Sequence, residues 1–280
     1  MAATTAGPIK IPYVEDFTRI YYPMQTLGHG SYSVVYRCYD RTSLQKVAVK
    51  VVTCQRYDQR RIESVLTEVE ALSLLGEAGL QYVPKFHRSF ACGATDTTVN
   101  LAIAMEYING LTLREFHYED RLTPDNYARI CLWLFDILAK IHSRDVVHRD
   151  IKPDNIIIKH VESGSMYLID FGFSCSTKSS DKLSDCVLGS SKGSLAYVAP
   201  EVLNNSYTDV ETLKKSDVFS AAVTLKVLVE PGVIDRTAKK IRLSHRPPIS
   251  LVLEKCLILD PARRPTAAWA AQTLQNYFKF

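Results

Sequence analysis

The stretch VVHRDIKPDNIII, from Val146 to Ile158, constrains the fold more than any other part of this 280-residue chain. Runs of branched aliphatic residues flank a group of charged and amide side chains. Such aliphatic runs usually form buried strands, whereas charged groups are rarely buried without a partner or a chemical role. The chain is therefore expected to place a polar loop between two buried segments, and this loop is the candidate site.

The composition is that of a globular protein. Apolar residues make up 46% and charged residues 23%, and no run of 18 or more apolar residues predicts a membrane span. The start, MAATTAGPIK, lacks the pattern of a secretory signal. A net charge of +4 is too small to predict binding to nucleic acid or membrane. The seven scattered cysteines are typical of reduced, mostly buried thiols, so we expect an intracellular protein, cytoplasmic or nuclear.

Two regions of different pattern follow a loose lead-in at residues 1–21. Residues 22–106 favour short strands around one helix, RRIESVLTEVEALSLLGEAG, which Gly76 and Gly79 are expected to close. The apolar residues at helical spacing on it are Ile62, Val65, Leu66, Val69, Leu72 and Leu75. Residues 111–280 are mainly helical in pattern, beginning with LTPDNYARICLWLFDILAKIHSRD. The change predicts two lobes joined by a hinge near residues 106–110.

The polar loop suits phosphoryl transfer, which requires positioning, a carboxylate facing the incoming hydroxyl, and cations on the phosphates. Asp150 can supply the carboxylate, and Lys152 can reach the transferred phosphate. Asn155 offers an amide oxygen to a hard cation. Asp170 follows an apolar strand and precedes Phe-Gly, which suits a magnesium ligand on a mobile joint.

Three further signals are weak when taken singly. The G-x-G in LGHGSYSVV lets backbone amides approach a phosphate, but most such pairs are ordinary turns. Lys50 ends the strand VAVK and can point its ammonium into a cleft, although an ordinary strand-end lysine is the simpler interpretation. Glu68, on the following helix, can pair with Lys50.

A distant ion pair is also expected. Glu201 lies in GSLAYVAPE and Arg264 in DPARRPT, and a bidentate pair between them would hold a loop against the helical region. Asp217 lies between them in SDVFSAAVTL.

In this order, the motifs resemble those of eukaryotic protein kinases of the serine/threonine type, over roughly Tyr22 to Tyr277. The resemblance implies an α+β, bilobal protein kinase fold at residues 22–280. Its N-lobe would be an antiparallel sheet with one helix, and its C-lobe would be mainly helical. The implied activity is transfer of the γ-phosphate of Mg-ATP to serine or threonine hydroxyls of proteins, in signalling or cell-cycle control. Lys152 within HRDIKPDN, and Ser194, carry the serine/threonine assignment.

The resemblance also assigns roles to residues. The positions that would contact ATP are Leu27, Gly28, His29, Gly30, Ser31, Tyr32, Ser33, Val34, Val35, Ala48, Lys50, Met105, Glu106, Ile108 and Ile157. Lys50 would hold the α/β-phosphates and pair with Glu68, while Asp150 would accept the substrate proton beside Lys152. The two magnesium ligands would be Asn155 and Asp170.

The remaining assignments are structural or regulatory. Asp217 would anchor the catalytic loop, and His148 would stack with Leu72 and Phe171 as part of the core. Phosphorylation at Ser190 or Ser191 would activate the enzyme, unless this serine-rich loop is never modified. Tyr32 lies where cyclin-dependent kinases carry an inhibitory tyrosine; a plain loop-tip aromatic is the alternative.

The sequence departs from the family between Asp217 and Arg264, where the region after the first helix is short. Four basic residues in that region form a candidate patch for an acidic or phosphorylated partner, and a solvated loop is the alternative: Lys239, Lys240, Arg242 and Arg246. Ser33 replaces the usual third glycine of the loop. The subfamily stays open between the Cdc7-type kinases that start DNA replication and NIMA-related or other mitotic kinases.

Two other functions compete with this one. A pseudokinase scaffold would keep the fold and bind nucleotide without transfer, but all six residues of the catalytic set are present: Lys50, Glu68, Asp150, Lys152, Asn155 and Asp170. A small-molecule kinase of the aminoglycoside or choline type would lack the Glu201 motif and its distant arginine.

Overall fold

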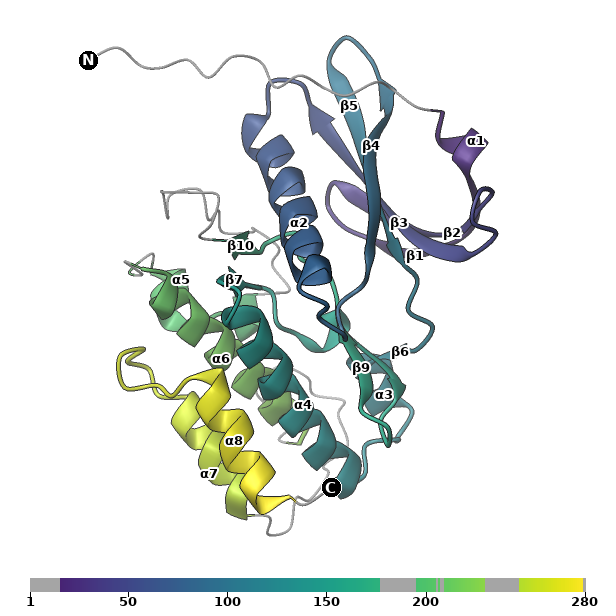
Figure 1. Ribbon diagram of the computed structural model, residues 1–280. Coiled ribbons are helices and arrows are strands. Elements are labelled where there is room, and N and C mark those ends of the chain that lie inside the picture. Colours follow the sequence, from purple (N-terminus) through teal and green to yellow (C-terminus); the bar gives the residue numbers. More distant parts are fainter. Residues whose placement is uncertain (1–15, 177–194, 205, 207–208, 230–246, 279–280) are drawn as a thin grey trace, which may run out of the picture. The chain divides into compact units, whose positions relative to one another are not determined.

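The computed structural model describes residues 16–176, 195–204, 206, 209–229 and 247–278 (Figure 1). The chain divides into two compact units, of which the first comprises residues 1–65 and 86–107 and the second residues 66–85 and 108–280. Helix α2, Gln59–Glu77, runs from the first unit into the second. The lobe boundaries expected from the sequence stay a prediction.

Unit 1 is built on a five-stranded antiparallel sheet in the order β1-β2-β3-β5-β4 (Figure 1). Its elements are α1 (Phe17–Ile20), β1 (Tyr21–His29), β2 (Ser33–Asp40), β3 (Lys46–Gln55), β4 (Phe86–Ala94) and β5 (Thr98–Glu106). Alternate residues of neighbouring strands, such as Val47 and Val49 on β3 and Ala102 and Ala104 on β5, belong to one core cluster. This two-residue period is the reason that the segment forms strands.

Helix α2 begins after Asp58, whose carboxylate accepts a hydrogen bond from the Arg61 amide at 3.2 Å. It continues through Gly76 and ends at Glu77, so the expectation that Gly76 closes it is wrong. Gly79 lies just beyond, with a φ of +67° that a glycine adopts without strain. Leu66 is on the apolar stripe read from the sequence, yet it is 48% exposed.

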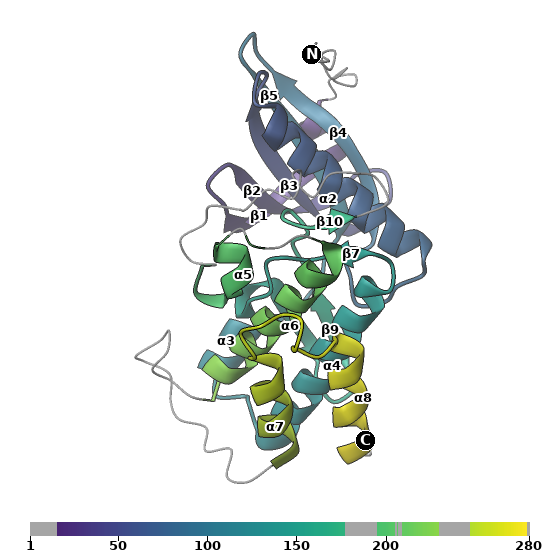
Figure 2. The same ribbon diagram turned by 90° about the vertical axis from the view of Figure 1, so that its left-hand side faces the viewer.

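Unit 2 is mainly helical, and α4, α6 and α8 lie side by side in both views (Figures 1 and 2). Its helices are α3 (Leu113–Tyr118), α4 (Pro124–His142), α5 (Pro200–Leu203), α6 (Val210–Val227), α7 (Pro247–Cys256) and α8 (Ala267–Tyr277). Helix α4 is capped by Thr123, which accepts from the Asn126 amide at 3.2 Å, and Pro124 occupies its first turn. Helix α6 begins seven residues before Asp217, earlier than its pattern suggested.

Two small sheets in unit 2 frame the candidate loop. The strands are β6 (Leu111–Thr112), β7 (Val146–Val147), β8 (Ile156–His160), β9 (Ser165–Leu168) and β10 (Cys175–Ser176). They form a three-stranded sheet, β6-β8-β9, and a two-stranded sheet, β10-β7. The aliphatic runs on either side of the polar loop are therefore strands β7 and β8.

The α+β class predicted from the sequence is confirmed. The expected shortening after α6 falls on residues 230–246, which lie outside the described part of the chain. Within the described part, all six cysteines are free and five are buried, in line with the reduced, buried thiols expected. None of the described helices is long and apolar enough to cross a membrane.

Candidate active site

Three polar side chains of the loop between β7 and β8 contact one another. Lys152 Nζ donates to Asp150 Oδ2 at 2.7 Å, and Asn155 Nδ2 donates to the same oxygen at 2.8 Å. Asn155 Nδ2 also donates to the Asp150 carbonyl at 2.8 Å. Asp150 and Asn155 are buried, so these bonds fix the carboxylate in an environment that solvent does not screen. The structure thus brings together three residues that the sequence singled out.

Asp217 on α6 holds the backbone at the start of this loop. Its two carboxylate oxygens accept from the His148 amide at 2.8 Å and the Arg149 amide at 2.7 Å. His142 Nε2 contacts Oδ2 of Asp217 at 3.0 Å. Asp217 is 1% exposed, and burial alone would raise its pKa. The hydrogen bonds from His142 and the His148 amide outweigh burial and lower the pKa of Asp217 below its usual value.

His148 is a core residue with a defined tautomer. Its Nδ1 accepts from the Asp150 amide at 3.3 Å, so its Nε2 donates to the Ile169 carbonyl at 3.0 Å. Its ring meets Phe171 edge-on, with the centroids 4.7 Å apart. Burial lowers the pKa of His148, which agrees with a neutral imidazole. Leu72, the third residue of the predicted stack, is also fully buried in unit 2, and its contact with His148 and Phe171 stays a prediction.

Asp170 has a left-handed backbone, with φ at 63°. Arg149 has a φ of 69°. A left-handed residue other than glycine costs on the order of 1–3 kcal/mol, and such residues cluster at functional sites. The Ile169 amide donates to the Asn155 carbonyl at 2.9 Å, which links the Asp170 segment to the loop. Both proposed magnesium ligands therefore lie on one hydrogen-bonded framework.

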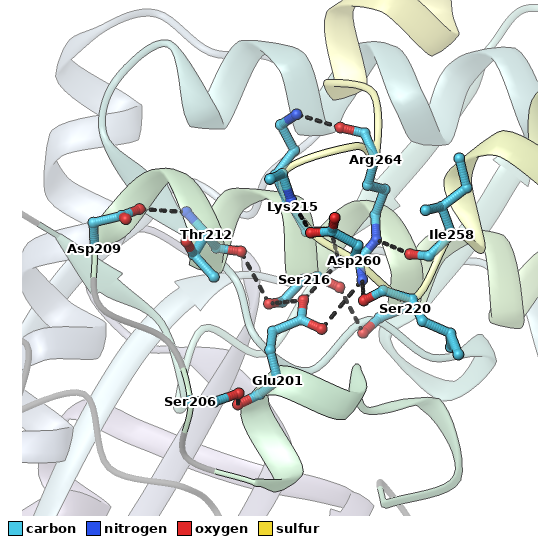
Figure 3. Close-up of polar contacts among 12 residues, drawn as sticks. Glu201, Ser206, Asp209, Thr212, Lys215, Ser216, Ser220, Ile258, Asp260 and Arg264 are labelled. Carbon is cyan, nitrogen blue, oxygen red and sulfur yellow. Dashed lines mark hydrogen bonds and ion pairs between the residues drawn. The ribbon is translucent and has the colours of Figure 1, made fainter.

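Glu201 and Arg264 form the predicted bidentate pair (Figure 3). Arg264 Nη1 donates to Glu201 Oε1 at 2.6 Å and Nη2 donates to Oε2 at 3.1 Å. The Ser216 hydroxyl donates to Oε1 at 2.7 Å, while Arg264 also donates to the carbonyls of Lys215, Ile258 and Leu259. Arg264 is 1% exposed, so its burial depends on this satisfied network.

The pKa of Glu201 is lowered as a result. Burial raises it, but the hydrogen bonds from Arg264 and Ser216 outweigh burial. The pair joins α5 to the segment before α8 and lies in the same unit as the catalytic loop. It therefore ties the start of α5 to the segment before α8.

The glycine-rich segment is a hairpin in unit 1. Gly28 pairs with Val35 in the β1–β2 register, and the Gly30 amide donates to the Ser33 carbonyl at 2.7 Å. A Cβ on Gly30 would lie 2.7 Å from the Ser33 hydroxyl, whereas one on Gly28 would meet nothing within 4 Å. Ser33 thus occupies the space beside Gly30 and leaves the turn intact.

The candidate adenine and phosphate positions of unit 1 lie on adjacent strands. Ala48 on β3 pairs with Met105 on β5, and Lys50 pairs with Val35 on β2. Lys50 is buried. Glu106 ends β5 and pairs with Val47.

Other predicted positions are distributed over both units. The hairpin tip and its flanks, which are exposed or half-exposed, carry Leu27, His29, Ser31, Tyr32 and Val34. In unit 2, Glu68 lies buried on α2, Ile108 is buried, and Ile157 is on β8. The Lys50–Glu68 pair stays a prediction. Positions outside the described residues are Ser190, Ser191, Ser194, Lys239, Lys240, Arg242 and Arg246.

Two residues that hold the site in place were not predicted from the sequence. His142 contacts Asp217, and its only signal was its place six residues before His148 in the run IHSRDVVH. Arg114 on α3 makes a bidentate pair with Asp154, at 2.6 and 2.8 Å. Burial raises the pKa of Asp154, but the hydrogen bonds from Arg114 outweigh it and lower that pKa. Asp154 stands inside the motif, but nothing in the sequence pointed to an arginine 40 residues earlier.

A sheet unit with a glycine hairpin, together with an HRD loop anchored by an aspartate from the following helical region, defines the class of protein kinase domains. The comparison with family models agrees, since residues 21–278 match the protein kinase domain. The chain belongs to the protein kinase domain family, as the sequence resemblance predicted. The relatives that it matches include proteins named as serine/threonine-protein kinases.

Three curated relatives illustrate this. Serine/threonine-protein kinase PKH3 of Eremothecium gossypii is 29% identical over 86% of this chain and 34% of that protein. Calcium-dependent protein kinase 29 of Arabidopsis thaliana is 30% identical over 95% of this chain and 50% of that protein. Serine/threonine-protein kinase ULK3 of Mus musculus is 29% identical over 86% of this chain and 51% of that protein. The chain thus spans from about a third to about half of the length of these relatives.

Proposed function

We propose that this chain transfers the γ-phosphate of Mg-ATP to serine or threonine hydroxyls of protein substrates. The observation that carries the proposal is the buried contact of Lys152 and Asn155 with Asp150, above a backbone anchored by Asp217. Two of the three relatives described are named as serine/threonine-protein kinases.

Asp150 is the residue that would receive the substrate hydroxyl. Two donors hold its Oδ2, so the carboxylate has one orientation before any substrate arrives. Preorganised groups lower the barrier because no reorientation is needed during the reaction. Lys152 is half-buried beside Asp150, and its ammonium would also stabilise charge on the transferred phosphate.

Asn155 and Asp170 would hold magnesium, and the donor set fits that ion. In Asn155 the amide nitrogen is used by Asp150, which leaves the amide oxygen as the metal-binding atom. An amide oxygen and one carboxylate suit Mg²⁺, which binds few protein oxygens and takes its other ligands from water and phosphate. When bound, magnesium would neutralise charge on the phosphates of ATP.

In unit 1, Lys50 would bind the α/β-phosphates, and the backbone amides of the Gly28–Val35 hairpin would cover them. Ala48 and Met105, paired across β3 and β5, would contact the adenine ring. This assignment rests on the register of the strands and on the family to which the chain belongs.

Regulation and partners are further proposals. Phosphorylation of Ser190 or Ser191 would activate the enzyme through Arg149, and undiminished activity after alanine substitution at both serines would remove this idea. The basic residues Lys239, Lys240, Arg242 and Arg246 would bind an acidic or phosphorylated partner. A role in signalling or cell-cycle control stays a prediction from the resemblance.

A peptide-array phosphorylation assay with magnesium and ATP tests the main proposal. The wild-type chain is expected to phosphorylate serine or threonine peptides, and Asp150→Asn is expected to lose about 10²–10⁴-fold of that activity because the proton acceptor is gone. Asp136→Asn, on the surface of α4, serves as the matched control with wild-type activity. A wild-type chain that binds Mg-ATP and phosphorylates no peptide would instead be a nucleotide-binding scaffold.

A further inference from the structure

The ring of Tyr32, at the tip of the β1–β2 hairpin, stacks against the guanidinium of Arg61 on α2. Arg61 Cζ lies 3.4 Å from the ring centroid, compared with 4.9 Å for Arg264 over Phe219. Both residues belong to unit 1. A separation this short places the cation directly on the face of the ring, which is the attractive geometry for a cation–π contact.

The carboxylate of Asp58 holds the Arg61 side chain in place. Its guanidinium pairs with the Asp58 carboxylate at 3.3 Å, and both side chains are only 25–29% exposed. The Asp58 amide donates to the Gln55 carbonyl at 2.9 Å, so the turn that follows β3 fixes the aspartate. Arg61 is therefore an oriented group and not a freely rotating surface arginine.

The backbone of Tyr32 is tied to the same strand. Its carbonyl accepts from the Thr53 amide on β3 at 3.0 Å. This bond prolongs the β2–β3 ladder, in which Ser33 pairs with Val52 and Val35 pairs with Lys50. The hairpin tip is thereby kept in register with the strand that carries Lys50.

Tyr32 is 58% exposed, so its burial does not stabilise the sheet unit to any large extent. The contacts of its ring and its carbonyl instead determine where the hairpin tip lies. They fix a segment whose backbone amides, on the proposed function, must be placed to receive phosphates. Holding such a segment in advance reduces the entropy lost on binding.

We propose that Tyr32, Arg61 and Asp58 form an aromatic clasp that positions the glycine-rich hairpin for nucleotide binding. The clasp rests on the proposed function and adds to it a set of positioning residues, of which Arg61 and Asp58 lie outside the nucleotide-contacting set. It requires the aromatic ring of Tyr32 and not its hydroxyl. This separates it from a role of Tyr32 as an inhibitory modification site.

A double-mutant cycle in nucleotide affinity tests the clasp. Calorimetric titration of Mg-ATP into Tyr32→Ala or Arg61→Ala is expected to give a dissociation constant about two- to five-fold above wild type, the equivalent of one cation–π contact. The double variant is expected to match the single variants, because the contact is already broken in each. In Arg61→Ala, which lies outside the nucleotide-contacting set, the KM for ATP should rise by the same factor while kcat stays at its wild-type value.

Two substitutions at Tyr32 separate the ring from the hydroxyl. Tyr32→Phe keeps the ring, so it is expected to bind Mg-ATP more tightly than Tyr32→Ala does, and Tyr32→Trp is expected to bind at least as tightly as Tyr32→Phe because indole is the better cation–π partner. Thermal melting checks that each variant is folded. Arg61→Lys keeps a cation and is expected to be intermediate, which provides a second measurement if Arg61→Ala does not fold.

Additive effects in the double variant, or equal weakening by Tyr32→Phe and Tyr32→Ala, would overturn the clasp. So would unchanged affinity in both alanine variants while the wild type binds normally. A wild-type chain that does not bind Mg-ATP would instead contradict the proposed function. Failure of the clasp and failure of the proposed function are therefore distinguishable.

Discussion

The glycine-rich hairpin and the catalytic loop both carry residues assigned to phosphate handling, but they are held in opposite ways. Every residue from 27 to 35 is exposed or half-exposed. From 148 to 155, every residue is buried or half-buried. The hairpin depends on its own turn and on the contact with Arg61, whereas the catalytic loop is anchored by Asp217 of helix α6.

This difference follows from what each segment would have to do. A group that aims at a reacting atom gains from one fixed geometry, which buried charge-assisted bonds supply. A segment that covers a nucleotide must admit and release it, and such segments are drawn from the less stable parts of a fold. The predictions below test whether stability and function divide between the two regions in this way.

The largest effect is expected from removing the anchor of the catalytic loop. Asp217→Ala leaves the His148 amide, the Arg149 amide and His142 without their acceptor, and should reduce the free energy of unfolding by about 3–5 kcal/mol. Urea denaturation measures it. Asp136→Ala, which removes an exposed i,i+4 pair with Lys140, is the control and should change it by about 0.3–0.5 kcal/mol. Equal shifts of the urea midpoint in both variants would mean that Asp217 stabilises the fold no more than an exposed ion pair does.

Two glycine substitutions compare the packing of the hairpin with that of strand β8, which follows the catalytic loop. In Gly110→Ala the new Cβ would lie 2.5 Å from the Ile158 carbonyl oxygen, so strand β8 must move, at about 1–3 kcal/mol. In Gly28→Ala the Cβ meets nothing within 4 Å, and the free energy of unfolding should change by less than about 0.5 kcal/mol. Urea denaturation of both variants decides the matter. Equal losses would mean that the hairpin is as tightly packed as unit 2.

Acid should weaken unit 2 through Glu201. Its pKa is lowered in the folded state from an ordinary value of 4.5, so its stabilising contribution is present above pH 4.5 and is lost as the pH falls through the folded-state pKa. One proton contributes at most about 1.4 kcal/mol per pH unit. Urea denaturation across the acid range should therefore show a steeper decline for the wild type than for Glu201→Gln. Parallel curves would show that Glu201 does not titrate with unfolding.

The smallest effect is expected at a turn of unit 1. Leu44 has a left-handed φ of 57° and is 66% exposed, so Leu44→Gly relieves backbone strain and loses little burial. The net gain should be about 0.5 kcal/mol after the larger chain entropy of glycine is subtracted. Thermal and urea midpoints measure it. Leu66→Gly, in an exposed position of α2, is the contrast and should lose about 1 kcal/mol. A loss at Leu44 would contradict the strain argument.

The sequence by itself determined the α+β class, the family and the short list of polar residues in the catalytic loop. These are encoded locally, because strand and helix periods and the HRDIKPDN spacing are read within a few residues. Even the Glu201–Arg264 pair was found, because a buried glutamate requires a cation and the arginine was marked by its own motif.

Only the tertiary structure decided which distant side chains contact the residues of the two regions. His142 contacts Asp217 and Arg114 pairs with Asp154 near the catalytic loop, while Arg61 packs on Tyr32 at the hairpin tip. No local sequence pattern encodes these contacts. The same applies to Leu66, whose helical spacing marked it as apolar face although it is exposed. Spacing indicates which side of a helix a residue occupies, but the packing of other elements decides whether that side is covered and which donor meets which acceptor.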